Sequence, residues 1–204
     1  NTPSAFVVRN VFEDAYNYMK SGQLLRQVVN KIQEGVDFNK AQERHEFGNL
    51  YEQLLRDLQN AGNAGEFYTP RAVTQFIVEQ VNPRLGESVL DPACGTGGFL
   101  TCAIEHLRKQ AKTAAHERKI QECFAGIEKK HLPHILCMTN LMLHGIDVPS
   151  NVRHDNTLAR PLRDWGPKER VDVIVTNPPF GGMEEDGIEM RVHFYDRRLR
   201  SGNR

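Results

Sequence analysis

The pattern of apolar and polar positions divides the chain into a helical first part and an alternating second part. Apolar side chains recur with helical spacing around residues 8–19, 25–32 and 47–58, which predicts three helices, the second ending near Gly35. The segment 60–65 is small and polar throughout, as is typical of a flexible joint. We expect the apolar stripes to form the core of a small helix bundle, and partner docking is the alternative.

After the joint, short β-type runs alternate with helical patterns. The runs lie at residues 88–90, 123–127, near 152 and at 171–176, with helical patterns at 99–107 and 132–143 between them. The last run is the most strongly β-like of the chain. This alternation predicts parallel βαβ units, and therefore an α/β fold with a parallel sheet behind a small all-α region.

One more helix is expected at residues 73–81, ahead of the sheet. Thr69 suits its N-cap and Pro70 its first turn. Phe67 and Tyr68 precede the cap and could pack as a hydrophobic staple. In the alternative interpretation Thr69 and this aromatic pair cover a cofactor, and the sequence leaves both open.

A glycine-rich turn at residues 91–97 follows the first predicted strand and leads into a helix, an arrangement that holds nucleotide-like cofactors. A P-loop is excluded because Gly-Phe follows Gly97 in place of Lys-Ser/Thr. The glycine pattern of dinucleotide-binding sites is not matched, because Leu100 occupies the position where that pattern requires a small residue. Asp91 at the strand end would repel a pyrophosphate but suits an ammonium group, as in S-adenosylmethionine. An ordinary βα turn without a ligand is the competing interpretation.

Three further polar residues end predicted strands and should share the rim of a parallel sheet with Asp91. Glu128 can accept hydrogen bonds from two ribose hydroxyls, or it is a solvated acid. Asp155 can accept from an adenine amino group, or it forms a turn with Asn156. Asn177 is the third of these residues and follows the last predicted strand.

Asn177 begins the stiff tetrapeptide Asn-Pro-Pro-Phe at residues 177–180. The Asn177 side-chain oxygen and the Pro178 carbonyl can act as two aligned acceptors for an exocyclic amino group. Phe180 offers a face on which a planar base can stack. A plain loop after a strand is the alternative.

The composition limits the classes of protein that remain possible. The 204 residues carry 26 basic and 26 acidic side chains, so the strongly basic footprint of a nucleic-acid binder is absent. Four scattered cysteines favour free thiols in a reducing cytoplasm. His131, His134 and Cys137 have a tempting spacing, but Pro133 interrupts it, and we expect no metal site there. The first residue is Asn1, and we expect the chain to be part of a longer protein.

Taken together, these segments resemble S-adenosylmethionine (SAM)-dependent N6-adenine DNA methyltransferases, most closely the modification subunits of type I restriction–modification systems. The segments that carry the resemblance are residues 66–71, 91–100, 140–146, 155–158 and 177–180. The similarity extends from the helical part to about Gly187.

The resemblance implies a Rossmann-like methyltransferase domain that transfers a methyl group from SAM directly to the amino nitrogen of adenine. The residues it assigns to the cofactor are Phe67, Tyr68, Thr69, Asp91, Ala93, Gly95, Thr96, Gly97, Gly98, Glu128, Asp155 and Asn156. The residues it assigns to an adenine flipped out of duplex DNA are Asn177, Pro178, Pro179 and Phe180.

The same resemblance implies double-stranded DNA, a specificity subunit, a restriction subunit and a second copy of the chain as partners, with no membrane. It divides the chain into a helical domain at 1–64, a methyltransferase domain at 65–189 and an atypical basic tail at 190–204. Its sheet is expected to be incomplete, with 171–176 as an exposed edge. We therefore expect the chain to bind SAM without methylating DNA alone. Alternatives are methylation of RNA bases or of protein glutamine, and a non-catalytic assembly module.

Overall fold

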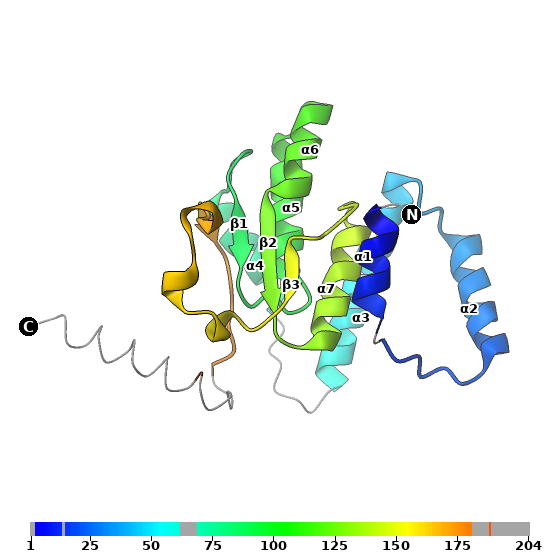
Figure 1. The fold of residues 1–204 in the computed structure, drawn as a ribbon. Coiled ribbons are helices and arrows are strands. Elements are labelled where there is room, and N and C mark those ends of the chain that lie inside the picture. Colours follow the sequence, from blue (N-terminus) through cyan, green and yellow to red (C-terminus); the bar gives the residue numbers. More distant parts are fainter. Residues whose placement is uncertain (1–2, 14, 62–68, 181–187, 189–204) are drawn as a thin grey trace, which may run out of the picture.

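A parallel four-stranded sheet in the order β3-β2-β1-β4 forms the centre of the molecule (Figure 1). A computed structural model describes residues 3–13, 15–61, 69–180 and 188. The strands are β1 (Val89–Asp91), β2 (Phe124–Glu128), β3 (Val152–His154) and β4 (Val173–Ile174). The predicted parallel α/β fold is thus confirmed.

The fourth strand is shorter than the predicted run 171–176. It pairs only with β1, with Val89 opposite Val173, and it forms the edge of the described sheet. The side chain of Ile174 is 59% exposed there. Within the described sheet β4 is therefore an edge strand with one hydrogen-bonded neighbour, as expected for 171–176.

The helices of the second part are α4 (Arg71–Val81), α5 (Gly98–Gln110), α6 (Ala114–Glu122) and α7 (His131–Leu143). Helix α5 packs on β1 and β2, and α7 packs on β2 and β3. The core between them is hydrophobic, and its fully buried side chains include Leu100, Ile104, Leu107 and Leu141. Each such side chain contributes about 1.5–3 kcal/mol through burial. Helix α6 was not predicted, because Ile120 is its one buried residue and one residue makes no apolar stripe.

The first part contains α1 (Pro3–Phe12), α2 (Gly22–Gly35) and α3 (Ala41–Ala61). Figure 1 shows α1 and α3 beside α7, with α2 outermost. The predicted helix over 8–19 is wrong beyond Phe12. The side chain of Asn17 accepts a hydrogen bond from the Met19 N–H at 2.9 Å, which is a local turn that replaces helical bonding.

The prediction of a bundle core is wrong for α2, which buries none of its residues. Its apolar stripe, formed by Leu25, Val28, Val29 and Ile32, is exposed. Helix α3 continues to Ala61, so the predicted joint begins later than expected, and its remainder lies outside the described residues. The described helices include none that is long and apolar enough to cross a membrane.

An ionic cluster joins α3 to the sheet domain. The carboxylate of Glu52, only 8% exposed, accepts hydrogen bonds from the Arg71 guanidinium and from the Thr101 hydroxyl at 3.1 Å. The other arm of Arg71 lies 2.6 Å from Glu105 Oε2. Three helices therefore meet at one guanidinium, and its removal would leave Glu52 charged and buried.

We predict that Arg71→Met destabilises the chain by at least about 2 kcal/mol, because an unpaired buried carboxylate costs far more than an exposed one. Denaturant unfolding measures the loss. Lys31→Met is the matched control, since Lys31 pairs with Glu34 on the exposed surface of α2 and its loss should change stability by well under about 1 kcal/mol. Equal effects of the two substitutions would contradict a structural role for the cluster.

Candidate functional site

The turn between β1 and α5 has a backbone shape that requires glycine. Gly95 and Gly97 have φ values of +54° and +85°, in the left-handed region. A Cβ on Gly97 would come within 2.8 Å of Cys137 Sγ on α7. The turn is therefore pressed closely against that helix.

Neighbouring elements fix the rest of this turn. The Cys94 N–H donates to the Ile127 carbonyl at the end of β2, at 3.0 Å. The Asn140 side-chain amide of α7 donates to the Thr96 carbonyl at 3.1 Å, and Asn140 is only 1% exposed. The sequence patterns gave Asn140 no role, because its contact depends on the tertiary packing of α7.

Asp91 is 1% exposed at the end of β1 and accepts a hydrogen bond from the Ala93 N–H at 3.1 Å. Burial raises the pKa of Asp91 to about 6, against the opposing effects of the Thr176 hydroxyl and the Ala93 N–H. The charge of Glu128 raises this pKa further. Among the described residues no cationic side chain contributes to the environment of Asp91. A buried carboxylate in this state suits a ligand that supplies a positive charge.

Glu128 at the end of β2 is tied to the glycine-rich turn. Its Oε2 accepts from the Gly95 N–H at 2.9 Å, and its Oε1 accepts from the Lys130 N–H at 2.7 Å. The carboxylate is therefore oriented by backbone and is not simply a solvated acid. Each oxygen has a second lone pair, so both can still accept from a ligand.

The loop after β3 also joins this rim. The Asp155 N–H donates to the Glu128 carbonyl at 3.0 Å, and the Thr157 hydroxyl donates to the Pro92 carbonyl at 2.6 Å. Asn156 accepts from the Leu158 N–H at 3.0 Å and so caps the 3₁₀ turn Thr157–Ala159, which fits its interpretation as a turn former.

Thr69 and Asn177 meet across the site. The Asn177 side-chain NH₂ group donates to the Thr69 hydroxyl at 2.9 Å. The Asn177 side-chain oxygen therefore points away from Thr69 and can accept a hydrogen bond from another group. The predicted N-cap role of Thr69 is wrong, because α4 begins at Arg71 with Pro70 as its cap and without a side-chain cap bond. The Thr69 hydroxyl instead links the start of α4 to the loop after β4.

The rest of the tetrapeptide faces outward. Pro178 and Pro179 are exposed, and the Phe180 ring is 80% exposed. Phe67 and Tyr68 lie outside the described residues, so the choice between a staple and a cofactor cover stays open.

One small cavity brings together six of the twelve predicted cofactor residues. Its volume is about 60 Å³, far below the roughly 300–1,000 Å³ of typical small-molecule sites, so a whole cofactor would extend along the rim beyond it. The cavity is lined by Thr69, Thr74, Asp91, Ala93, Cys94, Gly95, Thr96, Gly98, Phe99 and Asn177. Gly97, Glu128, Asp155 and Asn156 do not line it; Gly97 belongs to the same turn, and the contacts above attach the other three to it.

His131, His134 and Cys137 do not converge on one point. The Cys137 sulfur faces Cys94 Sγ at 3.9 Å, whereas the His134 ring is stacked on His154, with centroids 5.4 Å apart.

Comparison with known proteins identifies related sequences and structures. The N-6 DNA methylase family profile matches residues 42–203. The chain is 63% identical over 188 residues to the EcoEI type I restriction enzyme methylase subunit of Escherichia coli, covering 92% of this chain and 38% of that protein. It is 30% identical over 197 residues to the StySPI methylase subunit of Salmonella potsdam, covering 89% of this chain and 36% of that protein.

A solved modification subunit from Vibrio vulnificus YJ016 superposes with a TM-score of 0.78 at 53% identity, covering 89% of this chain and 38% of that one. The chain thus spans well under half the length of the relatives it matches.

We predict that Asp91→Asn stabilises the ligand-free chain at pH 8 by about 1–3 kcal/mol, since each unit of pKa shift corresponds to 1.36 kcal/mol. The pKa of Asp91 is raised from 3.8 to about 6, so its charge opposes folding above pH 6. This penalty is lost as the pH falls from 6 toward 3.8, and the gain from the substitution should shrink there. Unfolding at pH 8 and pH 5 measures both values.

Asp172→Asn is the matched control for this experiment. Hydrogen bonds from the Ser88 N–H and hydroxyl lower the pKa of Asp172, so its substitution should destabilise the chain at pH 8. A stabilising effect of both substitutions, or of neither, would contradict the assigned environment of Asp91.

We predict that Gly97→Ala destabilises the chain by about 1–2 kcal/mol, because an L-residue is strained at its φ and the added methyl group meets Cys137. Thermal unfolding measures this loss. Gly22→Ala is the control: it lies at the start of α2 with nothing within 4 Å of its new Cβ, and should be neutral or slightly stabilising.

Proposed function

The chain belongs to the N-6 DNA methylase family, and we propose that it is the N-terminal and catalytic part of a type I modification subunit that methylates N6 of adenine in DNA. The observation that carries this proposal is the hydrogen bond between Asn177 and Thr69. It ties the loop suited to hold an amino group to the cavity beside the glycine-rich turn.

SAM is the proposed cofactor, and it supplies the activated methyl group. The Asp91 carboxylate would accept a hydrogen bond from the ammonium group of the cofactor, and that group would supply a positive charge beside the buried carboxylate. Glu128 would accept from the ribose hydroxyls with the lone pairs that its backbone contacts leave available. Gly95 and Gly97 allow the ligand to approach the backbone closely.

Asn177 and Pro178 would bind the target adenine. The Thr69 hydroxyl accepts from the Asn177 NH₂ group, so the Asn177 oxygen is the side-chain atom oriented to accept from an adenine NH₂. The Pro178 carbonyl would accept the second hydrogen, and the exposed Phe180 ring would stack on the base. Two acceptors localise the nitrogen lone pair for direct attack on a methyl group, without a covalent enzyme intermediate.

The proposed substrate is double-stranded DNA with the adenine flipped out of the helix. The chain has no net charge, which supports delegation of phosphate and sequence contacts to a specificity subunit. We also propose a restriction subunit and a second copy of this chain as partners, and the cytoplasm, where the four free thiols remain reduced, as the location. The helical domain at 1–64, the methyltransferase domain at 65–189 and the tail at 190–204 remain a proposed division.

We predict that Asn177→Ala lowers methyl transfer to DNA at least about 100-fold while SAM affinity changes little, because the amide acts on the base and not on the cofactor. The measurement is transfer of labelled methyl groups by the full-length subunit assembled with its specificity subunit. Asn151→Ala, at an exposed asparagine beside β3, is the control and should keep full activity.

Calorimetric titration of SAM into the present chain separates the cofactor site from the base site. Wild type and Asn177→Ala should bind SAM alike, and Asp91→Ala should not bind. Methylation of DNA by this chain without partners would contradict the expectation that the described sheet lacks part of the base pocket. Unchanged methylation by Asn177→Ala in the full assembly would favour an assembly role for this loop.

A further inference from the structure

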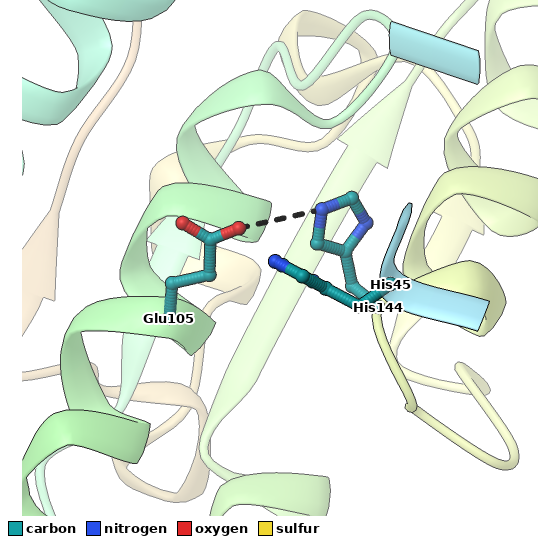
Figure 2. Close-up of side chains that lie close together, drawn as sticks. All are labelled: His45, Glu105 and His144. Atoms are coloured by element: carbon teal, nitrogen blue, oxygen red, sulfur yellow. Dashed lines mark ion pairs between the residues drawn. The ribbon is translucent and has the colours of Figure 1, made fainter. Parts of the chain in front are cut away.

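We propose that His45, Glu105 and His144 form a binding site for a divalent transition-metal ion of the zinc class, which fastens α3 to the sheet domain. The three side chains come from α3, from α5 and from the residue that follows α7, and they converge in Figure 2. One ligand atom from each lies within 4.8 Å of the others. Two imidazoles and one carboxylate are a ligand set that zinc uses in proteins.

His144 has a buried nitrogen that lacks a hydrogen-bond partner. Its Nδ1 lies 2.8 Å from the Asn140 carbonyl, and because a carbonyl only accepts, Nδ1 carries the proton. In the neutral ring Nε2 therefore presents a lone pair. The side chain is 0% exposed, and Nε2 has no hydrogen-bond partner.

Two carboxylates face that lone pair. Glu105 Oε1 lies 3.5 Å from His144 Nε2, and Glu52 Oε1 lies 3.8 Å from it. A lone pair opposed by carboxylate oxygens at these distances is unfavourable, and a positive charge among them would relieve the repulsion. That charge is either a metal ion or a proton on Nε2, and these two possibilities predict different experiments.

Outer contacts already orient two of the ligands as metal sites require. The Asn140 carbonyl fixes the tautomer and ring plane of His144. Arg71 engages Oε2 of Glu105 at 2.6 Å, which leaves Oε1 turned toward His144. This arrangement is independent of the site proposed for methyl transfer.

The distances between the ligand atoms fit an ion with tetrahedral coordination after a small movement of His45. Ligands at about 2.1 Å from zinc lie about 3.4 Å from one another, and Glu105 and His144 are already 3.5 Å apart. No two ligand atoms in the group are more than 4.8 Å apart, so the widest separation must close by at most about 1.4 Å. His45 is exposed on α3, with its ring edge-on to His144, so rotation of its side chain can supply this movement. Water would take the fourth position.

The charge of the cluster favours a cation. The guanidinium of Arg108 binds the His144 carbonyl and also lies 3.5 Å from Glu117. Glu52 and Glu105, the two carboxylates beside the ligand atoms, share the guanidinium of Arg71, which leaves a local excess of negative charge when both imidazoles are neutral. A divalent ion would offset that charge. It would also cross-link residues 45, 105 and 144, which lie on separate elements.

The test is titration of zinc chloride into the chelator-treated chain, followed by calorimetry and thermal unfolding. We expect one ion per chain and a higher melting temperature with zinc, but not with magnesium. His45→Ala should weaken zinc binding at least about tenfold and remove the rise in melting temperature. His45 is chosen because its exposed side chain can be removed without opening the core.

His116→Ala is the matched control, because His116 lies on α6 outside the cluster and its loss should leave zinc affinity unchanged. Cobalt(II) should give the visible absorption of a tetrahedral site in wild type and not in His45→Ala. Equal zinc affinity of wild type and His45→Ala would overturn the proposal. So would the absence of stoichiometric binding, which would assign the missing charge to a proton on His144.

Discussion

The close approach of the glycine-rich turn to α7 is the constraint on which the site depends. Gly97 has no room for a side chain against Cys137, and Asn140 binds the Thr96 carbonyl from the same helix. Because β1 and β2 hold the other side of the turn, its N–H groups and the Asp91 carboxylate are fixed before any ligand arrives. Such preorganisation avoids an ordering cost at the moment of binding.

The same rigidity has a cost at Asp91. Burial of a carboxylate with few stabilising contacts works against folding, as its raised pKa shows. Functional sites commonly break the rules that stabilise the rest of a fold, and the dense packing of α5 offsets that cost nearby. In the proposed function, cofactor binding and stability therefore compete at Asp91, whereas both favour glycine at residue 97.

Local sequence patterns predicted those parts of the fold that local chemistry determines. The strands, α5, α7 and the turn at Asp91 follow from periodicity and glycine spacing, and the parallel direction of the strands follows from their alternation with helices. The end of α1 was missed because the Asn17 turn competes with helix spacing. The exposure of α2 could not be predicted, since an amphipathic stripe does not reveal whether a partner element covers it.

Contacts between residues that are distant along the chain could not be predicted from the sequence. The sequence left Thr69 open between a helix cap and a cofactor cover, and only the tertiary structure places Asn177 beside its hydroxyl. Glu52 and Arg71 meet in the same way, as do the three residues of the histidine–glutamate cluster, which have no short-range spacing that a motif could describe. Composition alone cannot predict which charges pair when they are far apart along the chain.

The position of Glu52 has a consequence for how this architecture can evolve. Its carboxylate belongs to the helical part of the chain, yet its partners Arg71 and Thr101 belong to the sheet domain. A recombination event that exchanged only the helical part between relatives would succeed where the incoming helix supplied an acid at this position. Elsewhere Arg71 would keep Glu105 but lose one of its two carboxylate partners, so the need for an acid at this position limits which helical parts can be exchanged.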